Sequence, residues 1–143
     1  MKRYFLISTC IIAISFAGFT QKNVTPPPAA KSSFEKAFGG ASKVKWEREG
    51  ADYEVNFVQN GQEMSAVYNS KGALKETETE ISASDLPAAA SEYVKQHYKG
   101  KIKETAKITK ANGEVNYEVN INGNDVMFDS NGKHLKDVKE PKD

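Results

Sequence analysis

The stretch Tyr53-Glu54-Val55-Asn56-Phe57 returns further along the chain as Tyr117-Glu118-Val119-Asn120-Ile121. The pair Asn60-Gly61 follows the first copy, and Asn122-Gly123 follows the second. Such pairs favour tight hairpin turns, because both residues accept a positive φ angle. Matching segments in one order at a nearly constant spacing indicate an internal repeat.

The beginning of each copy repeats as well. Pro28-Ala29-Ala30 returns as Pro87-Ala88-Ala89, which sets Phe34 opposite Tyr93. Each copy has about 55 residues, a size at which a domain is marginally stable alone. We therefore expect the copies to share a sheet or a core. The two predicted repeats are residues 28–81 and residues 84–139.

Alternation in the second copy predicts a half-buried strand. Val115, Tyr117, Val119 and Ile121 fall on one face, and Glu114, Asn116, Glu118 and Asn120 fall on the other. A strand of this kind packs its apolar face on a core and turns its polar face to water. We therefore expect Glu118 and Asn120 on a solvated face, where they are candidate partner-binding residues.

Each copy is expected to open with a helix. Ala30, Phe34, Ala37 and Phe38 recur at helical spacing, and Gly39-Gly40 ends the pattern. Strands are expected next, at residues 43–49 and 102–109 and around the repeated stretches. The fold class is therefore α+β, with two tandem helix-plus-antiparallel-sheet units of α-β-β-β-β order. The stripe of the second helix comprises Leu86, Ala90, Tyr93, Val94 and His97.

Several of these motifs resemble the PepSY-like family. They include Pro-Ala-Ala, the aromatic helix, Lys43-Val44-Lys45-Trp46-Glu47, the Asn-Gly turns, and Asn69-Ser70-Lys71-Gly72 followed by Leu74-Lys75-Glu76-Thr77-Glu78. The family is described as similar to the beta-lactamase-inhibitor protein, and the resemblance covers residues 28–139. It implies an exported bacterial protein with a tandem helix-and-sheet fold and a binding or inhibitory role. The family has no established catalytic residues.

The N-terminus has the features of a secretory signal peptide. Lys2 and Arg3 precede an uncharged run over residues 4–20 that is too short for a transmembrane helix. We expect residues 1–20 to be removed, leaving a periplasmic or secreted protein without stable membrane insertion. An uncleaved anchor, or a lipid on Cys10, is the alternative. Residues 21–27 are expected to form an extended tether, and residues 140–143 a frayed tail.

Composition narrows the possible functions. The net charge is +1, and removal of Lys2 and Arg3 with the signal peptide lowers it to −1. Basic and acidic residues are interspersed, whereas nucleic-acid binding requires a concentrated basic surface. The one cysteine, Cys10, lies in the signal peptide. Disulfides and cysteine metal sites are therefore not expected in the mature chain.

Catalytic and metal-binding patterns are missing from the sequence. His97 fits a partly buried helix position and His134 a solvated turn, and neither has a second ligand at metal-site spacing. Residues 129–132 resemble a calcium loop, but their glycine comes at the place typical of a hairpin turn. The alternating Glu76, Glu78 and Glu80 favour a solvated edge strand. We predict a protein that is not an enzyme and has no cofactor.

Trp46 is either a core residue, which the alternation favours, or an exposed anchor for a partner. Without catalytic residues, the expected function is an exported binding module that inhibits or contacts another envelope or secreted protein. The alternative is a carrier of a small ligand or polysaccharide. An enclosed apolar pocket of about 300 Å³ or more would favour the carrier.

Overall fold

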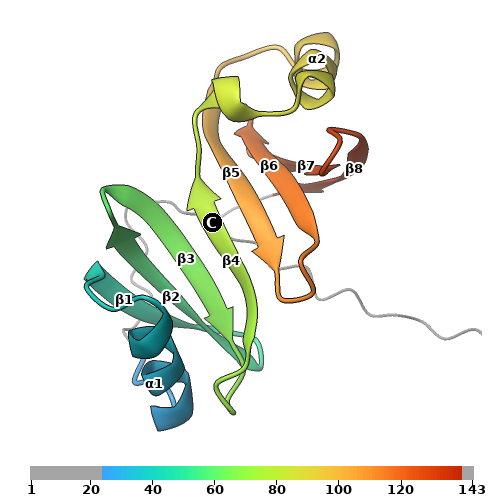
Figure 1. Cartoon of the computed structure of the whole chain (residues 1–143). Coiled ribbons are helices and arrows are strands. Elements are labelled where there is room, and N and C mark those ends of the chain that lie inside the picture. The colour runs from blue at the N-terminus through green and yellow to red at the C-terminus, as the bar shows by residue number, and fades with distance from the viewer. Residues whose placement is uncertain (1–23, 140–143) are drawn as a thin grey trace, which may run out of the picture.

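A computed structural model of the chain describes residues 24–139. The predicted signal peptide, residues 21–23 of the predicted tether and the predicted tail lie outside the described residues. The described part has the expected order of one helix and four strands, twice (Figure 1). A short 3-10 turn, Ala83–Asp85, precedes the second helix. The elements are α1 (Pro28–Ala37), β1 (Ser42–Glu49), β2 (Asp52–Gln59), β3 (Gln62–Tyr68), β4 (Leu74–Glu80), α2 (Ala88–His97), β5 (Ile102–Lys110), β6 (Val115–Ile121), β7 (Asn124–Asp129) and β8 (His134–Lys139).

All eight strands form one antiparallel sheet in sequential order from β1 to β8. The repeats join where Glu76–Glu80 of β4 pairs with residues 106–110 of β5. We expected the repeats to share a sheet or a core, and they share a sheet. The expectation that Glu76, Glu78 and Glu80 lie on an edge strand is wrong. Strand β4 lies in the middle of the sheet, because its free edge is covered by the other repeat.

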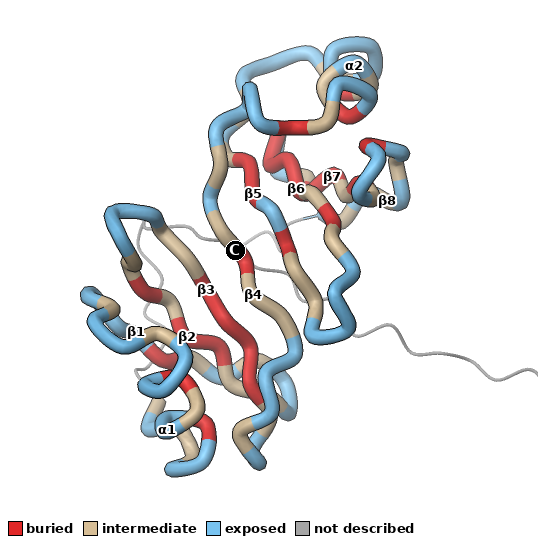
Figure 2. Tube along the Cα trace, viewed as in Figure 1, coloured by how far each residue is buried: buried red, intermediate tan, exposed pale blue. Residues whose placement is uncertain are grey.

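Both helices pack on the same face of the sheet. The register runs from Ala66 in β3 through Thr77 and Thr109 to Val115 in β6, so these side chains share one face. Ala66 lies in the cluster under α1, and the alternation of β6 carries Val119 into the cluster under α2. Figure 2 shows the buried residues following the strands beside each helix. The structure thus has two hydrophobic clusters on one sheet rather than one shared core.

The helices correspond with an offset of sixty residues. Ala30 and Phe34 are buried in α1, and Ala90 and Val94 are buried in α2. The match of Phe34 with Tyr93 inferred from the Pro-Ala-Ala motif is therefore wrong by one residue. Each helix begins directly after a proline, Pro27 or Pro87, so the structural repeat follows these prolines.

The hairpin turns follow the sequence prediction. Asn60 and Gly61 have φ angles of 52° and 81°, and Asn122 and Gly123 have 55° and 71°. The predicted turn at residues 129–132 is also present. The Asp129 carboxylate accepts hydrogen bonds from the backbone N–H groups of Asn131 (2.9 Å) and Lys133 (3.0 Å). This carboxylate therefore holds a turn together, as expected of the hairpin interpretation.

Two glycines bring these turns against the helices. Gly72 has a φ angle of 82°, and a Cβ atom there would lie 2.6 Å from the Ala29 carbonyl oxygen. Gly132 has a φ angle of 81°, and its Cβ would lie 2.7 Å from the Ala90 nitrogen. Only glycine combines this backbone conformation with such a close approach. In both repeats the turn therefore lies against the beginning of the helix, although the atoms in contact differ.

Candidate functional site

The sheet face opposite the helices is rich in carboxylates. We call this face the acidic face. The strand register places side chains of alternate residues on it from β1 to β8. Its lysines are fewer than its acids, and two of them are paired there, Lys45 with Glu47 and Lys75 with Asp52, each at 2.6 Å; the others are Lys110 and Lys136. Its acidic residues in the strands are Glu47, Glu49, Asp52, Glu54, Glu63, Glu76, Glu78, Glu80, Glu104, Glu118, Asp125 and Asp129.

Glu78 lies at the centre of the acidic face. Its side chain stands between Ser65 of β3 and Ile108 of β5, and the residue is 1% exposed. Within residues 24–139, its Oε2 atom has no hydrogen-bond partner. Burial, and then the neighbouring Glu118 and Glu54 carboxyls, raise the pKa of Glu78 well above its ordinary value. Burial and the neighbouring carboxyls therefore both favour the neutral form of Glu78.

Other carboxyls on this face are affected in the same way. Burial, and then the nearby Glu49, raise the pKa of Glu54 to about 7. Burial, and then Glu80, raise the pKa of Glu104 to about 7. A neighbouring cation would favour the charged forms of these groups and lower their pKa values. The acidic face therefore holds protons near neutral pH that a bound cation would release.

Glu118 and Asn120 lie on the acidic face, as the alternation predicts, but both are 6% exposed. The expectation that their face of β6 is solvated is therefore wrong at these positions. Glu118 stands between Ala106 and Met127 of the adjacent strands. Asn120 donates a hydrogen bond of 2.8 Å to the Asp125 carboxylate in the interior of this face. Alternation identifies the face of a strand, whereas exposure depends on the side chains of both neighbouring strands.

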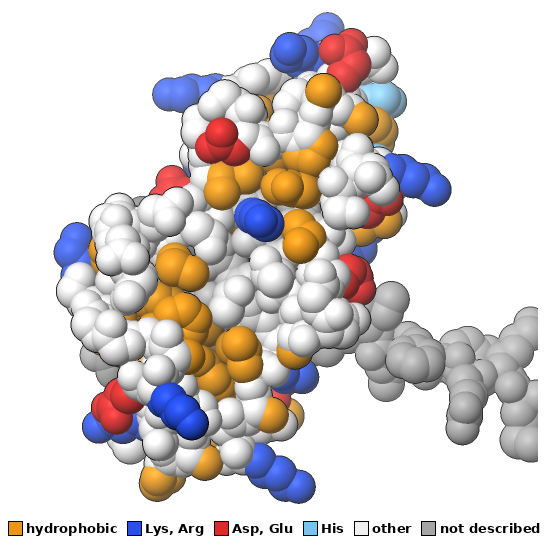
Figure 3. All heavy atoms as spheres, in the orientation of Figure 1, with side chains coloured by type: hydrophobic (Ala, Val, Ile, Leu, Met, Phe, Trp, Pro, Cys, Tyr) orange, Lys and Arg blue, Asp and Glu red, His pale blue; other side chains and the backbone are white. Residues whose placement is uncertain are grey.

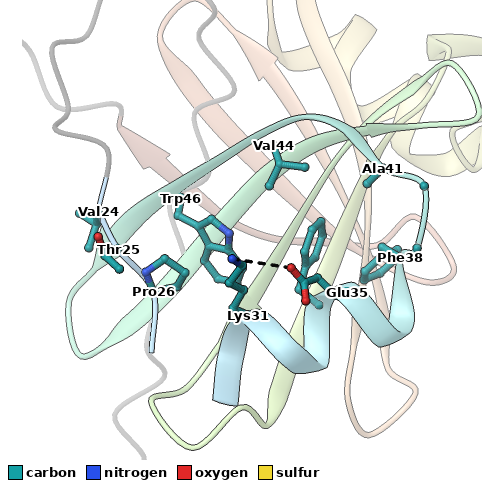
Figure 4. Close-up of a pocket in the computed structure, with 12 residues that line it drawn as sticks. Val24, Thr25, Pro26, Lys31, Glu35, Phe38, Ala41, Val44 and Trp46 are labelled. Carbon is teal, nitrogen blue, oxygen red and sulfur yellow. Dashed lines mark ion pairs between the residues drawn. The ribbon is translucent and has the colours of Figure 1, made fainter. Parts of the chain in front are cut away.

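Trp46 is a core residue, as the alternation favours. It is 8% exposed, and its ring packs edge-on against Phe34 at 5.6 Å between centroids. Its outer side lines a groove of about 540 Å³ between residues 24–26, α1 and β1 (Figure 4). The Lys31–Glu35 ion pair lies over this groove. A groove of about 490 Å³ lies beside α2, where Leu86, Val94 and Ile102 line it.

The two histidines come together in the second repeat, which the sequence did not indicate. The Tyr93 ring is stacked between His97 at 4.0 Å and His134 at 4.4 Å. His97 is exposed and His134 half-buried, so both expectations about their burial are wrong. His134 Nε2 lies 2.7 Å from Asp137 Oδ1. These contacts attach α2 to β8.

Asp137 also accepts a hydrogen bond of 2.6 Å from the Tyr98 hydroxyl. Burial alone would raise the pKa of Asp137, but the hydrogen bonds from Tyr98 and His134 outweigh it and lower that pKa. Burial, and then the bond to Asp137, raise the pKa of the Tyr98 hydroxyl. Asp137 therefore contacts both Tyr98 and His134, and these contacts connect the end of α2 to β8.

Residues 24–139 contain no group of three or more His, Cys, Asp or Glu side chains arranged to hold a metal ion. In the same part of the chain, no helix is long and apolar enough to cross a membrane.

Figure 3 views the helix side, where hydrophobic side chains gather mainly beside α1 and beside α2. The strand register places Glu76, Glu78, Glu80 and Glu118 on the opposite face.

Comparison with known proteins gives a family match. A family model described as "Putative beta-lactamase-inhibitor-like, PepSY-like" matches residues 21–76 and 52–136. The two overlapping matches agree with a tandem repeat. No curated protein matches the chain.

Solved structures from Bacteroides share the fold. A BLIP-like protein from Bacteroides fragilis has 22% identity and a TM-score of 0.63, with 84% of this chain and 92% of the other covered. One from Bacteroides eggerthii, described as "putative periplasmic proteins", has 16% identity, a TM-score of 0.70 and coverages of 81% and 90%. A DUF2874 family protein from Bacteroides uniformis has 15% identity, a TM-score of 0.68 and coverages of 80% and 90%.

Proposed function

Because the chain belongs to the PepSY-like family, whose model matches most of its length, we propose that it is an exported, non-catalytic binding module. Its acidic face receives a basic segment of another exported protein. Two observations support export: the features of residues 1–20, and the periplasmic description of the structural neighbour from Bacteroides eggerthii.

One observation carries the binding proposal, namely the buried and unpaired Oε2 atom of Glu78 amid other carboxyls. A buried carboxyl with acidic neighbours is unfavourable in its charged form, since nearby like charges and desolvation both oppose ionisation. A lysine or arginine side chain from a partner would supply positive charge at the outer carboxyls of this face, since Glu78 itself is only 1% exposed. Binding would then release protons from Glu78 and Glu54, so affinity should rise with pH through neutrality.

The carrier alternative is less well supported by the geometry. The grooves beside α1 and α2 are large enough for a small ligand, but both are open on one side rather than enclosed. A site that binds a small molecule usually surrounds most of the ligand surface. The continuous acidic face instead suits a larger partner with basic groups.

Capture from the envelope fraction by immobilised mature protein tests the proposal. Glu63→Lys and Glu80→Lys change the border of the acidic face, and Glu92→Lys on α2 is the matched control. We expect the first two variants to lose a partner that the wild type and the control retain. Retention by all the variants, with native melting, would exclude the acidic face as the binding site.

The proton linkage has its own measurement. For the captured partner, we expect tighter binding at pH 8 than at pH 6, because the charged carboxylates predominate at the higher pH. Glu78→Gln and Glu54→Gln should each reduce this difference. A pH profile that is unchanged in both variants would contradict the role of the buried carboxyls.

Export is tested separately by the intact mass of the protein from its native host. We expect an N-terminus near residues 18–21 and no acyl group. A chain that keeps Met1, or a lipid mass on Cys10, would contradict a soluble exported protein.

A further inference from the structure

The first strand of each repeat has a different neighbour. In the second repeat β5 is paired with β4, and the pairing ends at the hydrogen bond from Ile81 N–H to the Thr105 carbonyl (3.0 Å). Trp46 is the counterpart of Thr105, because they lie opposite Val55 and Val119, which are equivalent in the repeat. The Trp46 carbonyl accepts one bond from Val24 N–H, at 3.1 Å. Within residues 24–139, β1 has no strand on this side.

The outer edge of β1 therefore presents backbone groups that its counterpart uses for strand pairing. In an antiparallel sheet, alternate residues direct both N–H and C=O to the same side. Since the Trp46 carbonyl points outward, the backbone groups of Arg48 point outward too, whereas a bulge between Ser42 and Lys45 interrupts the alternation before it reaches Val44. Unpaired groups of this kind accept an added strand.

The charges on β1 indicate which kind of strand can pair with its outer edge. Lys45 and Glu47 flank Trp46 and lie on the acidic face. A two-fold axis at Trp46 would set Lys45 opposite Glu47 of the partner subunit, and Glu47 opposite Lys45 of the partner subunit. Moving the axis to Lys45 or to Glu47 would set identical charges opposite each other, which is unfavourable. Lysines on edge strands usually discourage pairing. Lys45 Nζ lies 2.6 Å from Glu47 Oε1 within the strand, and the dimer would exchange this ion pair for two equivalent pairs across the axis.

We infer that two copies of this chain pair antiparallel through β1, with the two-fold axis at Trp46. The contact is isologous, so one surface serves both subunits. Both α1 helices then lie on one face of a continuous sheet, and the grooves beside them meet across the axis. Val44, which is 43% exposed at the rim of the groove in Figure 4, becomes covered. The Val24–Trp46 hydrogen bond is replaced by bonds between the strands.

Charge reversal gives a sharp test by sedimentation or light scattering over a range of concentrations. For the exported protein we expect a monomer–dimer equilibrium. Lys45→Glu and Glu47→Lys should each raise the dissociation constant by about tenfold, because each places like charges opposite one another. The double variant Lys45→Glu/Glu47→Lys should restore the dimer. Lys139→Glu on β8, at the other edge, is the control and should change nothing.

Mixing the two single variants is the second part of the test. It excludes misfolding as the reason for a weakened dimer. A Lys45→Glu chain and a Glu47→Lys chain are complementary to each other, so their mixture should form heterodimers more readily than either variant self-associates. A wild-type protein that stays monomeric at high concentration would overturn the inference. So would a double variant or a mixture that is as monomeric as the single variants.

Val24→Pro tests the register, because proline has no N–H group to donate to Trp46. We expect this variant to dimerise more tightly, since the competing hydrogen bond is lost. Weaker dimerisation, with an unchanged melting temperature, would show that the chain at residue 24 remains beside β1 in the dimer. The proposed axis would then be wrong.

Discussion

The two repeats have the same arrangement of elements but different chemistry in their cores. Under α1 the contacts are aromatic, with Phe34 between Trp46 and Phe57 at centroid distances of 5.6 and 5.0 Å. Under α2 the buried residues are mainly aliphatic, and the aromatic contacts move outward to the Tyr93 stack. The difference shows that helix start, turns and register define the unit, while the side chains filling it can vary.

The largest expected effect compares the same helix position in the two repeats. Phe34→Ala should lower the free energy of unfolding by about 3–5 kcal/mol, because it leaves a cavity among aromatic rings. Val94→Ala, at the equivalent position, should cost about 1–2 kcal/mol, since less apolar surface is lost. Urea unfolding measures both. Equal losses in the free energy of unfolding would mean that the aromatic and the aliphatic cluster respond alike to truncation. The difference between their side chains would then not affect stability.

The second prediction concerns pH and distinguishes the acidic face from the helix side. Because the pKa of Glu54 is raised to about 7, the folded state binds more protons than the unfolded state between about pH 4.5 and 7, and the raised pKa of Glu78 acts in the same direction. Stability should therefore fall as pH rises through this range, by roughly 2–3 kcal/mol from Glu54. Glu114 and Asp137 have lowered pKa values and titrate below this range.

Thermal unfolding at pH 5 and pH 8 measures this effect. Glu78→Gln combined with Glu54→Gln should flatten the profile and raise stability at pH 8. The control is Glu92→Gln, an exposed change on α2 that should leave the profile as it is. A wild-type protein more stable at pH 8 than at pH 5 would contradict the sign.

The third prediction tests whether the turn contacts are equivalent. Gly72→Ala and Gly132→Ala should each cost about 1–3 kcal/mol, because alanine is strained at these φ angles and its Cβ would meet helix backbone. Gly113→Ala has a similar φ angle of 85° but no atom near the new Cβ, so it separates strain from collision. Equal costs at all three glycines would show that the helix contacts contribute nothing.

The smallest expected effect belongs to the stack that exists only in the second repeat. Tyr93→Leu keeps an apolar side chain but removes the ring between His97 and His134. We expect a loss of about 1 kcal/mol, in the range measured for aromatic pairs. Hydrogen exchange should also quicken at β8 more than at β6. An increase confined to α2 would mean that the stack does not hold β8.

Much of the fold follows from local sequence, because its turns and strands are set by neighbouring residues. Asn60-Gly61 and Asn122-Gly123 predict the hairpins correctly, since the positive φ angles belong to those residues themselves. The alternation of β6 likewise gives the correct face for Tyr117 and Glu118. The position of β4 in the middle of the sheet was missed, because no local pattern shows which strand lies beside Glu78.

The candidate site was predicted less well for the same reason. Glu118 and Asn120 are on the expected face, but their burial comes from neighbouring strands that are distant in sequence. Lysine substitutions there should therefore destabilise the protein, whereas a solvated position would tolerate them. Tyr117 is half-buried, so its truncation should cost less than that of a full core residue. The meeting of His97 with His134 depends on the packing of α2 against β8.

The sequential order of the strands has a consequence for how the chain folds. Every neighbouring strand pair except β4–β5 is joined by a short turn, so most contacts can form early between nearby residues. The β4–β5 pairing instead joins residues such as Glu76 and Lys110 across the whole of α2. Closing that longer loop costs more chain entropy than forming a hairpin. We therefore expect each four-strand half to assemble first, and the joining of β4 to β5 to limit the folding rate.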